Sequence, residues 1–148
     1  MKELVLFLHI VFASLWVGGM IFLAFVVSPF VRKLPIRDQV FQEVGRRFSF
    51  YGTFISLLIL FITGLINAHY IVGITSLFDL SSTYTKTLLH KIGIFLLVVV
   101  VSLFHDVYFG PRAVSSSFHR LMAKFLGFIN LFLSLFIVYL AVKLRFGG

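Results

Sequence analysis

Histidine is the residue type in this sequence with the broadest chemistry, and all five histidines lie within or at the edge of a long apolar run. Neutral imidazole is the commonest protein ligand for metals and a frequent ligand of haem iron. An ionisable side chain inside a membrane-length apolar run is costly to bury and usually faces a bundle interior. The candidate site residues are therefore His9, His69, His90, His105 and His119.

Four apolar stretches must position these side chains, at residues 4–31, 48–74, 88–109 and 125–142. Each is close to or above the length that crosses a hydrocarbon core as a helix. Leu, Phe and Val fill them without an alternating polar face, which favours helices over barrel strands. The sequence thus predicts an all-α membrane protein, with residues 1–148 forming a single integral membrane domain. The expected architecture is an antiparallel four-transmembrane-helix bundle.

The composition excludes several classes of protein. Sixty per cent of the 148 residues are hydrophobic and 12% are charged, whereas soluble domains have about 25% charged residues. A soluble enzyme is therefore excluded. The absence of cysteine excludes disulfides, thiolate metal sites and a thiol nucleophile. No nucleophile–base pair or pair of carboxylates is evident, so hydrolysis is not expected.

The net charge of +8 is interpreted as a topology signal rather than a nucleic-acid interface, because the basic residues lie between the apolar runs. Eight of them fall on one side of the membrane: Arg32, Lys33, Arg37, Arg46, Arg47, Arg112, Arg120 and Lys124. The other five fall on the opposite side: Lys2, Lys86, Lys91, Lys143 and Arg145. The positive-inside rule then predicts a multi-pass protein of a bacterial-type inner (plasma) membrane, with the N and C termini outside.

A weak internal repeat relates the two halves of the chain. His9 is followed by Pro29 twenty residues later, and His90 by Pro111 twenty-one residues later. Because the first and third spans run in the same direction, this spacing is that of a parallel two-helix repeat.

The depths of the histidines favour a haem site. His9, His69 and His90 lie toward the outer face, whereas His105 and His119 lie toward the cytoplasmic face. The first and third spans are diagonal in an up-down-up-down bundle, so His9 and His90 could grip one haem b between them. His69 could replace either ligand, and a second haem at His105 and His119 has less support. The plain alternative is that histidines near span ends lie in the headgroup region.

Neighbouring residues fit this haem hypothesis. Gly93 would let the macrocycle lie against the backbone, and Trp16 lies on the same helical face as His9. Lys91 and Tyr84 could bind the haem propionates on the outer side, with Lys86. Packing remains the plainer interpretation of Trp16. The polar residues of the second and fourth spans are likewise expected to be helix contacts: Ser56, Thr63, Asn67, Gly127, Asn130 and Ser134.

Two other functions stay open at this point. A cluster of His9, His69 and His90 could bind copper or zinc. Transport of Cu(I) is disfavoured because the chain has no cysteine and only three methionines. The protein could also be a scaffold subunit whose histidines are incidental.

The sequence resembles the copper-resistance protein D (CopD-like) membrane domain family over most of the chain through Pro111. That family shows a His on the first span, a Trp-x-Gly-Gly step, a proline at the end of the span, Arg-Phe before the second span, Thr-Gly near its end and a Lys on the third. The matching residues here are His9, Trp16, Gly18, Gly19, Pro29, Arg47, Phe48, Thr63, Gly64 and Lys91. The family name implies copper handling across the inner membrane.

The first and third spans are also similar to HemJ-type protoporphyrinogen oxidases, which are membrane haem proteins. The shared features are His9-Ile10, with Trp16 and Gly19 after it, and Leu89-His90. The Pro-Arg-x-Phe-Val-Tyr-His ending of the first span and the Asn-Glu-x-Pro before the fourth are missing here. Both families look related to b-type cytochromes that pass electrons between quinol and outer-side acceptors.

The resulting expectation is an integral membrane haem b protein that transfers electrons or acts as a membrane oxidoreductase. The expected partners are membrane lipid and a quinol or another redox partner, without nucleic acid. Whether the chain is an enzyme, and whether it forms a homodimer, stay open at this point.

Overall fold

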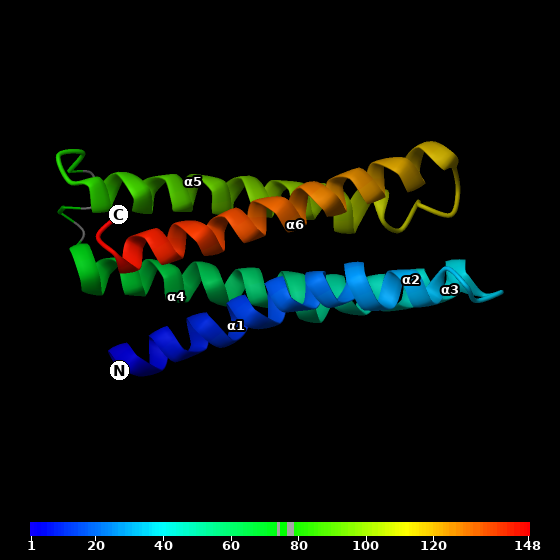
Figure 1. Cartoon of the computed structure of the whole chain (residues 1–148), viewed down its shortest axis with the longest axis horizontal. Coiled ribbons are helices and arrows are strands. Elements are labelled where there is room, and N and C mark those ends of the chain that lie inside the picture. The colour runs from blue at the N-terminus through cyan, green and yellow to red at the C-terminus, as the bar shows by residue number, and fades with distance from the viewer. Residues whose placement is uncertain (74, 77–78) are drawn as a thin grey trace.

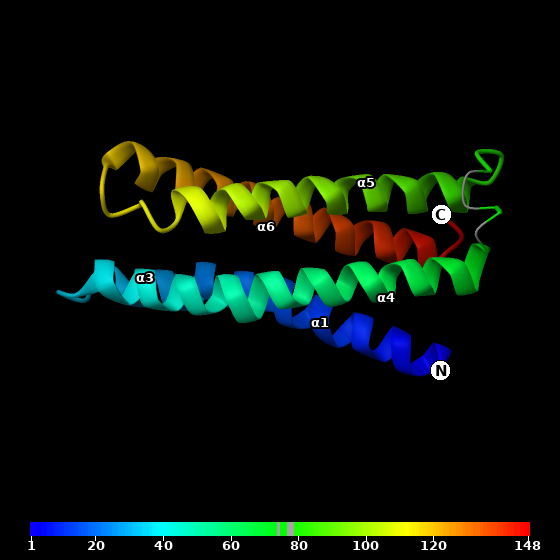
Figure 2. The ribbon, with the colours of Figure 1, turned by 180° about the vertical axis from the view of Figure 1, so that it is seen from behind.

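The computed structural model describes residues 1–73, 75–76 and 79–148. Every regular element in these residues is helical, and four long helical rods cross the molecule side by side (Figures 1 and 2). Within the described residues, four helices are long and apolar enough to cross a membrane. The predicted all-α bundle of four membrane helices is confirmed.

Each rod is built from one or more helical elements. The first rod contains α1 (Lys2–Phe22), a π-helical segment (Leu23–Val27) and α2 (Ser28–Val31). The second contains α3 (Arg37–Arg47), a π-helical segment (Phe48–Phe54) and α4 (Ile55–Val72). The third contains α5 (Thr83–Leu103) and a π-helical segment (Phe104–Phe109), and the fourth is α6 (Ser117–Arg145).

Most helices extend further than the apolar runs predicted. The second rod begins at Arg37 rather than at residue 48, because Glu43 forms ion pairs with Arg46 and Arg47 that suit a helical surface. The last rod covers Ser117–Arg145 rather than residues 125–142. Residue 74, where the second span was expected to end, lies outside the described residues.

Both chain termini lie at one end of the bundle (Figure 1). We call this the terminal end, and we call the opposite end, which holds the α2–α3 and α5–α6 connections, the loop end. The first two rods pack as one antiparallel hairpin and the last two as another, and α1 also contacts α6. The N-terminal turns of α1 diverge from the other rods in both views (Figures 1 and 2).

Two of the π-helical segments have matching positions in the two hairpins. One begins fourteen residues after His9 in the first rod and one fourteen residues after His90 in the third. In each of these rods the segment precedes the repeat's proline, Pro29 or Pro111. The π-helical segment of the second rod has no counterpart in α6, so the parallel two-helix repeat stays a prediction.

The bundle core is centred on Trp16, which is 1% exposed. It packs in one cluster with Leu57 of α4, Val98 of α5 and Ile137 of α6, so each of the four rods contributes. The sequence interpretation of Trp16 as a packing residue therefore fits its position. Most other large apolar side chains of the spans are exposed on the bundle surface, as expected where lipid is the solvent.

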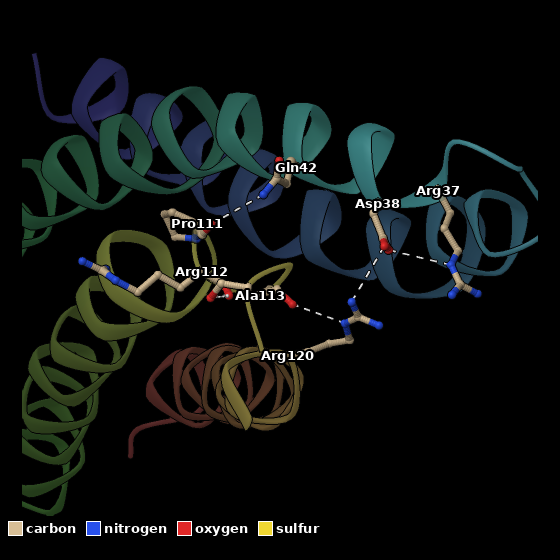
Figure 3. Close-up of polar contacts among 8 residues, drawn as sticks. Arg37, Asp38, Gln42, Pro111, Arg112, Ala113 and Arg120 are labelled. Carbon is tan, nitrogen blue, oxygen red and sulfur yellow. Dashed lines mark hydrogen bonds and ion pairs between the residues drawn. The ribbon is translucent and has the colours of Figure 1, made fainter. Parts of the chain in front are cut away.

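Polar contacts join the two hairpins at the loop end (Figure 3). Arg120 of α6 lies 3.7 Å from Asp38 of α3, and Gln42 donates a 3.5 Å hydrogen bond to the carbonyl of Pro111. Arg120 also donates to the carbonyl of Ala113. Because these groups are exposed, each ion pair stabilises the fold by only about 0–1 kcal/mol.

Phe48 fits against two glycines, Gly19 on the first rod and Gly52 on its own rod. A Cβ atom added at Gly19 would lie 2.8 Å from Cζ of Phe48, and one added at Gly52 would collide with the same ring. The ring is thus confined by α1 on one side and by its own helix on the other. Gly19 and Phe48 both belong to the motifs that carry the CopD-like resemblance, so the structure gives these motifs a packing role.

We expect Gly19→Ala to destabilise the protein by about 1–3 kcal/mol, the usual cost of overpacking a tight contact. Gly18→Ala is the matched control, because a Cβ there meets nothing within 4 Å. Thermal unfolding in detergent should show a lower midpoint for Gly19→Ala and an unchanged midpoint for Gly18→Ala. Equal midpoints for the two variants would contradict the proposed confinement of Phe48.

Candidate functional site

His9 makes a hydrogen bond between two rods near the terminal end. Its Nδ1 lies 2.8 Å from Oγ1 of Thr63, which is 5% exposed on α4. The Thr63 hydroxyl donates its own proton to the carbonyl of Ile59 at 2.7 Å. Thr63 must therefore accept from His9, which places the imidazole proton on Nδ1 and leaves the Nε2 lone pair available.

Gly64 lets the His9 ring approach α4. A Cβ atom at Gly64 would lie 3.4 Å from Cε1 of His9, closer than most contacts of real Cβ atoms. Thr63 and Gly64 are the Thr-Gly pair of the CopD-like motifs. The structure thus brings together two motif elements, on the first and second spans, that are 54 residues apart in sequence.

Lys91 lies on α5, the third rod, toward the terminal end. Its side chain is half-buried. Among the described residues, Lys91 takes part in no ion pair. A half-buried ammonium in a membrane bundle is costly without an anionic partner, so this position favours a ligand that carries negative charge.

Asn67 adds a further unsatisfied group. It lies one helical turn beyond Thr63 on the same face of α4, and its Nδ2 is buried with no hydrogen-bond partner among the described residues. Structural surveys find that buried polar atoms nearly always have a partner. Asn67 therefore offers a buried donor one helical turn from Thr63, and packing alone leaves it unsatisfied.

The other two histidines toward the terminal end, His69 and His90, are exposed. His69 is exposed on α4 next to the ring of Tyr70, and His90 is exposed on α5. Within the described residues, no group of three or more His, Cys, Asp or Glu residues could hold a metal ion. The structure therefore does not assemble His9, His69 and His90 into one cluster, and the exposure of His90 gives no support to it as a ligand opposite His9.

Two further residues assigned to the haem site, Gly93 and Tyr84, both lie on α5. Gly93 is exposed on α5, where a Cβ atom would meet nothing within 4 Å. Tyr84 lines a shallow pocket at the terminal end together with Asp79 and Ser82. Among the described residues, neither Gly93 nor Tyr84 forms a hydrogen bond with the His9 ring, so their roles toward a cofactor stay predictions.

At the loop end, His105 has the same hydrogen-bonding arrangement as His9. Its Nδ1 lies 2.5 Å from Oδ1 of Asp106, so the ring donates to a carboxylate. Its Nε2 faces α6, where a Cβ atom at Gly127 would lie 3.3 Å away. Histidines that bind metals commonly donate their second nitrogen in this way, but here Nε2 is directed at a neighbouring helix.

His119 has a structural role. The hydroxyl of Ser116 lies 2.6 Å from Nδ1 of His119 and accepts from its backbone N–H at 3.2 Å, which caps the start of α6. The rings of Tyr108, Phe109 and Phe118 surround the imidazole. His119 therefore contributes to the structure of the first turn of α6.

The polar residues of the spans behave as helix contacts. Asn130 donates a 2.8 Å hydrogen bond to Ser102, which joins α6 to α5. Ser56 and Ser134 are both fully buried. The predicted packing role holds, although Ser56 Oγ and Asn130 Oδ1 remain without hydrogen-bond partners among the described residues. The spacing of the small polar residues predicted these helix contacts but not the unsatisfied atoms.

Comparison with known proteins gives a family without an assigned activity. Residues 11–120 match the Domain of unknown function DUF4149. An uncharacterized protein of Aquifex aeolicus (strain VF5) is 50% identical over 148 residues, which covers 99% of this chain and 97% of the relative. No solved structure matches. The CopD-like and HemJ-like resemblances stay predictions.

Proposed function

This chain belongs to the DUF4149 family, and we propose from its own side chains that it binds haem b in the membrane. In this proposal His9 is an iron ligand at the terminal end of the bundle, and the protein transfers electrons. The proposal extends to a membrane oxidoreductase only if a substrate also binds near the haem.

The observation that carries the proposal is the orientation of the His9 ring. Thr63 accepts the Nδ1 proton of His9 at 2.8 Å, and the Thr63 hydroxyl is itself committed to the Ile59 carbonyl. This chain of hydrogen bonds fixes one tautomer and leaves Nε2 as the coordinating atom. A histidine that ligates a metal usually has such a partner on its second nitrogen.

The neighbouring groups fit the carboxylates of a porphyrin. Lys91 provides an ammonium with no ion-pair partner among the described residues, and Asn67 provides a buried N–H donor without an acceptor. An imidazole lone pair, a cation and an amide donor are the groups that an iron porphyrin with two propionates requires.

Haem, when bound, would supply reversible one-electron chemistry at iron. The residues of this chain would set the haem's position and potential. His9 would hold the iron, Thr63 would keep the imidazole in its coordinating tautomer, and Lys91 would favour the negatively charged end of the group. The proposed electron donor or acceptor is a quinol in the membrane or another redox partner.

Copper binding through a three-histidine cluster has less support. His69 and His90 are exposed, and the described residues contain no group of at least three His, Cys, Asp or Glu suited to a metal ion. The sequence also offers no cysteine, and soft ligands are what Cu(I) prefers. No observation favours porphyrinogen oxidation.

The proposal is tested on protein produced with ample haem precursor and purified in detergent. We expect the Soret band of haem b in the reduced-minus-oxidised spectrum and one iron per chain by elemental analysis. A colourless protein that retains copper would replace the haem proposal with copper binding. A colourless protein without metal would overturn both.

We also propose that the terminal end faces outward from a bacterial-type inner membrane. The termini share this end (Figure 1), and eight of the thirteen basic residues lie toward the loop end, between residues 32 and 47 and between residues 112 and 124. Positive charge is retained on the cytoplasmic side. The orientation would place the His9 site near the outer face.

Single-cysteine variants test this orientation, since the chain contains no cysteine. We expect Gln39→Cys, at the loop end, to be protected from an impermeant maleimide added to intact cells. Gly147→Cys, at the terminal end, should be labelled under the same conditions. The reverse labelling pattern would mean that the termini lie in the cytoplasm.

A further inference from the structure

Basic residues outnumber acidic residues at the loop end of the bundle. Eight lysines and arginines lie toward this end. The structure pairs some of them with two carboxylates, Asp38 and Glu43, and two arginines share each carboxylate. Four basic residues take part in no ion pair within the part of the chain that the structure describes: Arg32, Lys33, Arg112 and Lys124. The loop end therefore has positive charge to offer to an external anion.

Arg112 differs from the other three because its side chain is held in place. Its guanidinium carbon lies 4.5 Å from the centroid of the Tyr108 ring, and its Nη1 donates a 3.0 Å hydrogen bond to the Tyr108 carbonyl. An arginine has five N–H donors, and this bond uses one of them. Figure 3 shows the side chain extending away from Asp38 and Arg120. A guanidinium that is already ordered loses less conformational entropy when it binds an anion.

The turn that carries Arg112 is also fixed. The carbonyl of Pro111 accepts a hydrogen bond from Gln42 of α3 (Figure 3). The carbonyl of Arg112 accepts from the backbone N–H of Ser115 at 2.9 Å and from its hydroxyl at 2.7 Å. These bonds leave the side chain of Arg112 as the exposed part of an ordered turn.

The length of the third rod places Arg112 among the lipid headgroups. The rod covers Thr83–Phe109, which is 27 residues and about 40 Å as a helix. A bilayer with its headgroups is about 40–45 Å thick. Arg112 follows the end of this rod by three residues, and Tyr108 lies in its last turn. Tyrosine is enriched at the interface between membrane and water, so both side chains lie near the depth of the lipid phosphates.

An exposed apolar surface begins beside this pair and continues toward the membrane centre. The rings of Tyr108 and Phe118 both contact the ring of His119, so the start of α6 lies next to the end of the third rod. Phe118, Leu121 and Phe125 are exposed on one face of α6. A cation at headgroup depth above an apolar face has the arrangement of groups that contacts a phospholipid.

We propose that Arg112 and Tyr108 bind the phosphate of an anionic phospholipid, whose acyl chains lie against the exposed face of α6. Guanidinium groups bind phosphate oxygens through paired, charge-assisted hydrogen bonds. A zwitterionic headgroup also carries an ammonium, which needs a carboxylate. Asp38 and Glu43 are already shared by arginines, and Asp106 pairs with His105. An anionic headgroup is therefore favoured, and the proposal does not depend on haem.

Native mass spectrometry of the full-length protein in detergent tests the site. The protein is titrated with phosphatidylglycerol, which is anionic, or with phosphatidylcholine, which is zwitterionic. We expect the unmodified protein to bind phosphatidylglycerol at least several-fold more tightly. Arg112→Gln should weaken that binding about tenfold, because charge-assisted hydrogen bonds are lost. Tyr108→Leu keeps the charge and should weaken it about two- to fivefold, because the stacked ring is lost.

Arg32→Gln is the matched control for Arg112→Gln. It removes the same charge from the same end, and Arg32 is exposed, with neither an ion pair nor an aromatic ring as partner among the described residues. We expect it to change the affinity for phosphatidylglycerol by less than twofold. Equal weakening in Arg32→Gln and Arg112→Gln would show that diffuse charge attracts the lipid, and would overturn the assignment to Arg112.

Two further results would overturn the proposal. One is equal affinity of the unmodified protein for the two lipids. The other is unchanged affinity for phosphatidylglycerol in both Arg112→Gln and Tyr108→Leu, with folding checked by circular dichroism. Inorganic phosphate is added as a competitor at the same concentration as the lipid. Displacement of the lipid by phosphate would identify a site for a soluble anion and would contradict lipid binding, whereas retention of the lipid supports it.

Discussion

Replacing His9 by alanine is expected to remove the haem bands from the purified protein, while His119→Ala retains them. Among the three histidines toward the terminal end of the described structure, only His9 is partly buried, with Thr63 accepting its Nδ1 proton. Without that imidazole, the terminal end keeps Lys91 and Asn67 but loses the atom that would coordinate iron. The measurement is the Soret-band amplitude per chain in the reduced-minus-oxidised spectrum.

The comparison with His119 separates ligation from misfolding. His119 has its own hydrogen bonds with Ser116 at the start of α6. The His119→Ala variant therefore tests whether removing a partly buried imidazole is enough to unfold the protein. Both variants should elute from a sizing column as the unmodified protein does. Full haem content in folded His9→Ala protein would show that His9 is not a ligand.

Replacing Thr63 by valine is expected to weaken haem binding by about tenfold or more, the usual effect of removing a partner of a ligating histidine. Valine has nearly the shape of threonine but cannot accept the Nδ1 proton of His9. The freed ring can then change its tautomer or rotate, so Nε2 is no longer held as the coordinating atom. Titration of apoprotein with haem, followed by absorbance, measures the change.

Thr63→Ser is the control for this substitution. Serine keeps a hydroxyl at the same position, and such hydroxyls can also donate to a carbonyl four residues earlier, as Thr63 does with Ile59. We expect its haem affinity to be close to that of the unmodified protein. Equal weakening in Thr63→Val and Thr63→Ser would indicate that packing, rather than the hydrogen bond, matters at this position.

The fold could be predicted because the membrane imposes a simple requirement. In runs of Leu, Phe and Val long enough to cross the membrane, a helix gives every backbone N–H and C=O group a hydrogen-bond partner within the run. The ends of the helices could not be predicted as well. Charges at Arg46 and Arg47 suggested a loop, yet their ion pairs with Glu43 keep the chain helical back to Arg37.

The π-helical segments also could not be predicted from the sequence. They shift the angular position of every later residue in a rod, so a face predicted from 3.6-residue spacing is only local. Their matching positions after His9 and His90 became visible only in three dimensions.

The site was predicted in part. The motifs at His9, Thr63 and Lys91 were recognised, and the structure joins His9 to Thr63 by a hydrogen bond and leaves Lys91 half-buried on α5. The angular position of His90 was not predicted, because adjacent residues on a helix differ by about 100°. Lys91 is half-buried, and His90 beside it is exposed. Depth along a span can be read from sequence, whereas the facing direction depends on packing.

The most direct test of the central claim, that the imidazole of His9 coordinates haem iron, is chemical rescue. His9→Gly protein is prepared without haem, and haem is then added with and without free imidazole. We expect haem to co-elute with His9→Gly protein from a sizing column only when imidazole is present, because the free ring replaces the missing side chain beside Thr63. Haem that co-elutes in full without imidazole would contradict the coordination of iron by His9, as would an unmodified protein that binds no haem.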